Sequence, residues 1–133
     1  MALRGFPGIR SAALLLALLT SFPIAAHHSF AIFDRDVQIT LTGTVKAFQW
    51  TNPHVFIQLM VKNAEGVDEE WSIEGASPNM LFRSGWTNQS FKPGDKVTIV
   101  ANPLRDGKHG ANFVFAQLPD GKTLGQLNSR APG

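Results

Sequence analysis

The four histidines are the residues of this sequence best suited to chemistry. His27 and His28 are adjacent, whereas His54 and His109 lie far from them and from each other along the chain. An imidazole nitrogen is a good ligand for copper, zinc or nickel, so several histidines brought together would bind a transition-metal ion. No tight His-x-x-x-His or cysteine-based ligand spacing is present. The sequence therefore predicts a metal site only where the fold brings distant histidines together.

Each histidine also has an ordinary role open to it. His27 and His28 can be part of an unstructured end of the chain, His54 follows a proline and can hydrogen-bond across its turn, and His109 lies between a lysine and a glycine in a solvated loop. Two or three ligands are a simpler expectation than all four in one site. The sequence alone leaves both interpretations open.

The first 26 residues are typical of a secretory signal peptide. Arg4 and Arg10 precede an apolar run at residues 11–22, and small or tolerated residues occupy positions 24–26. The run is too short for the roughly 20 apolar residues of a membrane anchor. We expect Sec-type export to the periplasm or the exterior, cleavage after residue 26, and a mature protein that is not membrane-embedded. Cleavage there gives His27 a free amine, which can chelate a metal together with its own ring.

Removal of the signal peptide changes the charge of the protein. The chain has 12 basic and 10 acidic residues, and the segment 1–26 holds two of the basic ones and none of the acidic ones. The mature 107 residues, enough for one domain, then carry ten of each and a formal net charge of zero. A nucleic-acid binder usually shows a basic patch or stripe, so we expect no nucleic-acid partner.

The mature chain is expected to consist mainly of strands. After an N-terminal arm at residues 27–36, period-two alternation and turn residues predict strands at 37–50, 54–62, 69–75, 96–101 and 111–118, within a domain spanning 37–127. Gly43 predicts a bulge or bend in the long first strand. Ser77 and Pro78 predict the start of a short helix that Gly85 ends. Residues 128–133 are expected to be a frayed end.

This order of elements favours an OB-fold-like five-stranded Greek-key barrel, with the helix between the third and fourth strands. The competing immunoglobulin-like sandwich needs about seven strands and has no place for the helix. In an OB-fold the loop after the first strand and the loop after the fourth flank the ligand-binding face. We therefore expect His54 and His109, one in each loop, to be neighbours.

Aromatic and amide side chains form a second candidate site. Trp50 and Asn52 lie at the edge of the first hairpin loop, where a tryptophan ring can form the floor of a small-ligand pocket. Trp71 and Trp86 are interpreted as core residues, Trp71 sharing one strand face with Ile73.

No catalytic residue is predicted, and we expect a protein that is not an enzyme. The sequence has no Gly-x-Ser-x-Gly elbow, glycine-rich phosphate loop or cysteine nucleophile. The carboxylates of Glu74 and Asp106 are candidates to hold the second nitrogen of a histidine, as metal sites require. The acidic run at residues 68–70 is interpreted as a solvated hairpin tip.

Several sequence motifs, taken together, resemble the domain of unknown function 6152 family of small exported bacterial proteins. The motifs are His27-His28-Ser29-Phe30, Gly43-Thr44-Val45, Trp50-Thr51-Asn52-Pro53-His54, Trp71-Ser72-Ile73-Glu74-Gly75, Leu81-Phe82-Arg83-Ser84-Gly85-Trp86, Lys92-Pro93-Gly94-Asp95-Lys96-Val97 and Asn102-Pro103-Leu104-Arg105-Asp106-Gly107. The resemblance covers nearly the whole mature chain. It implies export and a shared fold, and it brings no assigned reaction.

The sequence thus predicts an exported, non-enzymatic binding module. Its ligand is expected to be a copper or zinc ion, or another small ligand, at the histidine-bearing loops. The alternative is a module that docks on another protein of the cell envelope, with incidental histidines and no metal.

Overall fold

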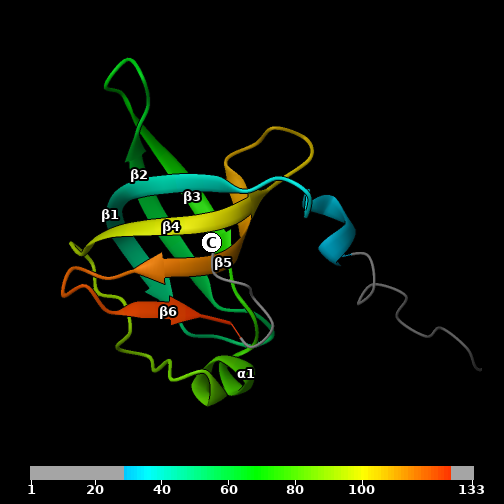
Figure 1. Cartoon of the computed structure of the whole chain (residues 1–133), viewed down its shortest axis with the longest axis vertical. Coiled ribbons are helices and arrows are strands. Elements are labelled where there is room, and N and C mark those ends of the chain that lie inside the picture. Colours follow the sequence, from blue (N-terminus) through cyan, green and yellow to red (C-terminus); the bar gives the residue numbers. More distant parts are fainter. Residues whose placement is uncertain (1–28, 127–133) are drawn as a thin grey trace, which may run out of the picture.

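A computed structural model describes residues 29–126 as a small β-barrel with one short helix (Figure 1). In chain order its elements are the 3-10 turn η2 (Ser29–Ile32), the strands β1 (Ile39–Gln49), β2 (Phe56–Lys62) and β3 (Asp68–Glu74), the helix α1 (Pro78–Arg83), and the strands β4 (Lys96–Pro103), β5 (Gly110–Gln117) and β6 (Thr123–Gly125). The predicted signal peptide, His27, His28 and the predicted frayed end 128–133 lie outside the described residues.

The strands form one sheet that closes on itself. Their order is β3-β2-β1-β4-β5-β6, and a parallel pairing of β3 with β5 completes the barrel. All other neighbouring strands are antiparallel. The predicted OB-fold-like class is confirmed: five strands close the barrel and α1 lies between β3 and β4.

The long strand β1 serves two partners because it bends. Its first half pairs with β4 and its second half with β2, and the register shifts between Val45 and Ala47. Gly43 lies where the two pairings overlap, and it is paired with both β2 and β4. A Cβ atom at Gly43 would overlap the carbonyl oxygen of Met60, so the close approach of β1 to β2 requires a residue with no side chain here.

The core fills the barrel, and α1 closes one end of it. Trp86, Phe91 and Phe113 are fully buried, with ring centroids of Trp86 and Phe113 4.8 Å apart in an edge-to-face arrangement. The Trp86 Nε1–H donates to the carbonyl of Gly125 at 2.9 Å, which joins the segment after α1 to β6. Figure 1 shows α1 at the end of the barrel away from the β2–β3 hairpin tip.

Strand β6 was not expected from the sequence. It has only three residues, too few for an alternation pattern, and it is held by pairing with β5 and by the contact with Trp86. Ser77 and Pro78 begin α1 as expected, although the Ser77 side chain makes no capping hydrogen bond. Within residues 29–126 no helix is long and apolar enough to span a bilayer.

Candidate functional site

The loop between β1 and β2 holds His54 rigidly. The loop contains a cis peptide bond between Asn52 and Pro53. The hydroxyl of Thr51 donates to the carbonyl of His54 at 3.3 Å. The next residue, Val55, is fully buried and exchanges backbone hydrogen bonds with residues 75 and 76. The backbone on both sides of His54 is therefore anchored.

His54 contacts Glu74, the last residue of β3. Its Nδ1 lies 2.6 Å from Glu74 Oε1, and the side chains are 26% and 14% exposed. Burial raises the pKa of the Glu74 carboxyl, and the interaction with His54 opposes that rise. The side-chain amide of Asn112 on β5 donates to the backbone carbonyl of Glu74 at 3.3 Å. Glu74, a candidate from the sequence to hold a histidine nitrogen, thus has such a contact with His54.

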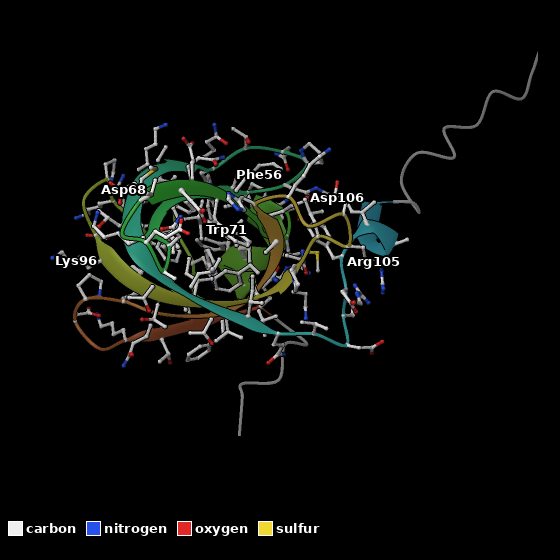
Figure 2. All side chains as sticks on the ribbon, turned by 90° about the horizontal axis from the view of Figure 1, so that it is seen from above. Phe56, Asp68, Trp71, Lys96, Arg105 and Asp106 are labelled. Carbon is white, nitrogen blue, oxygen red and sulfur yellow. The ribbon has the colours of Figure 1, made fainter. Side chains whose placement is uncertain are left out.

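The loop between β4 and β5 carries a second histidine–glutamate pair. The ring of His109 stacks on Trp71 with centroids 4.8 Å apart, and its Nε2 lies 3.5 Å from Glu69 Oε2. The other carboxylate oxygen of Glu69 accepts a hydrogen bond from Asn63 Nδ2 at 2.9 Å. Seen from above, Trp71 lies within the ring of strands at the end of the barrel away from α1 (Figure 2). His109 thus covers part of this barrel mouth.

The two pairs do not meet. Their glutamates are five positions apart on β3, roughly 17 Å along a strand, and alternate to opposite faces. The loop after β4 does not extend to the Glu74 end, because β5 begins opposite Ser72 and the loop runs back along β3. We expected His54 and His109 to be neighbours, and the structure instead keeps them apart. Both loops contact β3, but at opposite ends of this strand.

The described residues alone do not assemble a multi-ligand metal centre. Within residues 29–126 no group of three or more histidine, aspartate or glutamate side chains is arranged to hold a metal ion. Each histidine–glutamate pair offers one imidazole nitrogen and one carboxylate, two groups that ligate zinc. A metal at either pair therefore needs further ligands from water or from residues outside this range, which include His27 and His28.

The N-terminal arm is fixed to the loop that carries His109. The Arg105 N–H donates to the carbonyl of Ile32 at 2.9 Å, and Phe33, which is buried, forms a β-bridge with Leu104. The side-chain amide of Asn102, itself buried, donates to the carbonyl of Val37 at 2.7 Å. Both views show η2 beside this loop, and Figure 2 places Arg105 next to it.

The other predicted site residues have different surroundings. The ring of Trp50 lies 5.9 Å from that of Phe48, which also contacts Trp86 and Phe91, so Trp50 extends the core toward the β1–β2 loop. Asn52 is exposed in that loop. Among residues 29–126, Asp106 pairs with Lys108 and with no histidine. Its carboxylate accepts the backbone N–H of Lys108, which lowers the pKa of the Asp106 carboxyl.

Glu69 was missed because the acidic run was interpreted as a solvated hairpin tip. A signal was present: alternation places Glu69 on the same strand face as Trp71 and Ile73. The alternation therefore indicates that the Glu69 carboxylate lies next to Trp71 on the core-facing side of β3, rather than in solvent.

Comparisons with known proteins identify the family of this chain. A family model described as a family of unknown function, DUF6152, matches residues 15–113. No curated protein sequence matches the chain.

Among solved structures, two crystal forms of Rim1 are similar to this chain. Rim1 is a mitochondrial single-stranded DNA binding protein of S. cerevisiae. The sequence identities are 12% and 10%, and each TM-score is 0.46. Each alignment covers 62% of this chain and 93% or 92% of the Rim1 chain. Binding to single-stranded DNA is a property of Rim1, and the similarity concerns the fold alone.

Proposed function

For this chain, which belongs to the DUF6152 family of unknown function, we propose an exported binding protein that holds a copper or zinc ion beside the β4–β5 loop. The ligands would be His109 and Glu69 from the barrel, with His27 or His28 from the arm. The proposal includes cleavage after residue 26, so that the amine of His27 is available. It also includes a binding rather than a catalytic role, because no nucleophile or acid–base motif occurs in the sequence.

The observation that carries this proposal is the attachment of the arm to the loop that bears His109. Because Ile32 is hydrogen-bonded to Arg105, the arm leaves the barrel four positions along the loop from His109. The five residues from Ile32 back to His27 span at most about 18 Å when extended. That length allows an arm histidine to reach the β4–β5 loop, whereas His54 lies near the other end of β3.

The spacing of His109 and Glu69 suits a metal ion between them. A tetrahedral zinc ion with nitrogen and oxygen ligands at about 2.0–2.2 Å places those two atoms roughly 3.3 Å apart. The observed separation of Nε2 and Oε2 is 3.5 Å. Asn63 already fixes the other oxygen of Glu69, and this kind of outer support orients a ligating carboxylate. Binding would thus need little movement of the barrel.

The N-terminal amine adds a fourth donor. Its ordinary pKa is about 7.7–8.0, so a metal ion displaces its proton readily near neutral pH. The amine and the ring of His27 can close one chelate, leaving His109 and Glu69 to complete the site. Copper and zinc both accept this nitrogen-rich set.

The test is a calorimetric titration of copper and zinc into the exported protein, purified without a polyhistidine tag. We expect one tight equivalent, with His109→Asn and Glu69→Gln each weakening it about tenfold or more. His54→Asn is the matched control, because it removes the other glutamate-paired histidine, and it should leave the affinity unchanged. Equal binding by wild type and His109→Asn would contradict the proposal. A mass measurement on the same sample reports whether His27 is the first residue.

Docking on another envelope protein is the second candidate function. The observation in its favour is that β6 pairs with β5 alone among the described strands, so the part of its other edge at Thr123, next to the Gly125 carbonyl that Trp86 occupies, can accept a strand from a partner. A metal-free protein that captures one envelope protein, and loses it when Leu124→Pro disrupts β6 pairing, would favour this function over the metal site.

A further inference from the structure

We propose that the outer face of β2 and β3, at the end next to the β1–β2 loop, binds an organic cation between Glu74 and Phe56. The ligand class is a guanidinium or ammonium group, either on a small molecule or on an arginine or lysine side chain of a polypeptide. This site is separate from the proposed metal site and does not depend on it.

The charge of Glu74 is the first reason. Its side chain is only 14% exposed, and burial without a cation disfavours a carboxylate. Its ion-pair partner among residues 29–126 is His54, which is charged only when protonated, and no lysine or arginine in that range pairs with it. A bound guanidinium group keeps its charge at neutral pH and would pair with this carboxylate whether or not His54 is protonated.

The aromatic neighbour is the second reason. Phe56 is directly opposite Glu74 in the β2–β3 register, so the two side chains share the outer face with Cβ atoms about 4.5–5.5 Å apart. Their neighbours Ile57 and Ile73 point into the core, which confirms the alternation. A carboxylate beside a partly exposed aromatic ring attracts a planar or quaternary cation through both its charge and the ring face. Glu74 and Phe56 supply that pair.

The surroundings do not compete with such a ligand. Lys62 on β2 is paired with Asp68 at 2.8 Å, and Lys46 on the adjacent β1 is paired with Glu70 at 2.6 Å, both toward the hairpin tip. Around Glu74 the face carries neutral polar groups: Asn112 adjoins it from β5, and Ser72 precedes it on the same strand face. Among residues 29–126, an incoming cation therefore meets one carboxylate whose only ion-pair partner is His54.

An organic cation fits the geometry better than a metal ion. His54 Nδ1 and Glu74 Oε1 are 2.6 Å apart, closer than two ligands around a zinc ion, so a metal would have to separate them. A guanidinium group can instead approach Oε2 of Glu74 and leave the contact of Oε1 with His54 intact.

The experiment is a nuclear magnetic resonance titration of the exported protein, with a chelator present so that metal binding plays no part. The probes are the peptide acetyl-Gly-Arg-Gly-amide, its citrulline analogue, which is nearly isosteric but uncharged, and arginine amide as a free small molecule. We expect the arginine peptide to shift the amide signals of residues 54–56 and 74. The citrulline peptide should leave these signals in place. Similar shifts from both peptides would overturn the proposal.

Three variants locate the site. Glu74→Gln should weaken binding roughly tenfold or more, because it removes a charge-assisted hydrogen bond. Phe56→Leu should weaken it roughly two- to fivefold through loss of the ring face. Glu69→Gln, at the other histidine-paired glutamate of β3, is the matched control and should bind as wild type does. Wild-type affinity in both Glu74→Gln and Phe56→Leu would overturn the proposal.

The free and peptide-borne cations distinguish the source of the ligand. Equal affinity for arginine amide and the peptide indicates a small-molecule cation, whereas clearly tighter binding of the peptide indicates a polypeptide partner. Because the titration is performed without metal, its failure leaves the proposed metal site standing, and failure of the metal site leaves this result unaffected.

Discussion

Replacing Gly43 with alanine should destabilise the barrel far more than the same replacement at Gly75. A Cβ atom at Gly43 would overlap the Met60 carbonyl oxygen and lie 3.0 Å from its carbon and 3.1 Å from Leu59 Cγ. The obstruction is backbone of the neighbouring strand, which cannot rotate away as a flexible side chain can. The pairing of β1 with β2 must therefore shift.

The expected cost of Gly43→Ala is near the top of the range for overpacking, about 3 kcal/mol. For a domain of this size, a loss of 1 kcal/mol lowers Tm by about 4–8 °C, so the variant should melt more than about 10 °C below wild type. A Cβ atom at Gly75 would make only ordinary contacts, the nearest at 3.5 Å from Leu81 Cδ1. Gly75→Ala should thus change stability by less than about 1 kcal/mol.

Urea denaturation followed by circular dichroism measures both variants against wild type. If Gly43→Ala is as stable as Gly75→Ala, the claim that the close approach of β1 to β2 excludes a side chain at position 43 is wrong. The bend that lets β1 serve two partners would then need another explanation.

Three further predictions concern the contacts that hold the candidate sites. Trp86→Phe leaves the Gly125 carbonyl without its 2.9 Å donor and should cost about 1–3 kcal/mol in urea denaturation, with faster hydrogen exchange in β6; unchanged exchange would contradict this. Because burial raises the pKa of Glu74 in the folded state, that group favours folding below its ordinary pKa of 4.5 and loses this contribution as pH rises through the folded-state pKa. Glu74→Gln should therefore gain stability relative to wild type between about pH 4.5 and 7, and a relative loss over that range would refute the assignment. Asn102→Ala removes the 2.7 Å bond to Val37 and should speed proteolytic cleavage at Arg35 while leaving the barrel folded, whereas an unchanged cleavage rate would show that Asn102 does not hold the arm.

Much of the fold follows from local patterns in the sequence. Strand alternation and the Ser77-Pro78 helix start each predict an element that the structure contains, whereas the bulge or bend predicted at Gly43 corresponds to a register shift further along β1, between Val45 and Ala47. These signals are local because they reflect side-chain alternation and backbone preferences within a few residues. Strand β6 lacks such a signal, since three residues are too few to show a period and its stability comes from β5 and Trp86.

The candidate sites were harder to predict because they depend on register between distant segments. The position of His109 opposite Trp71 follows from the parallel pairing of β5 with β3, and nothing in the sequence specifies where β5 begins along β3. The antiparallel register of β2 with β3 places His54 beside Glu74, away from His109. Loop identity alone predicted which loops carry His54 and His109, but not which residues these histidines contact.

The most direct test of the metal site is to map where a paramagnetic ion binds. Substoichiometric copper added to isotope-labelled exported protein broadens the signals of amides close to it. We predict that the signals of Glu69, Trp71 and His109 broaden first, while those of His54 and Glu74, at the other end of β3, persist. Broadening centred on His54, or spread evenly over the surface, would contradict a metal site at the β4–β5 loop.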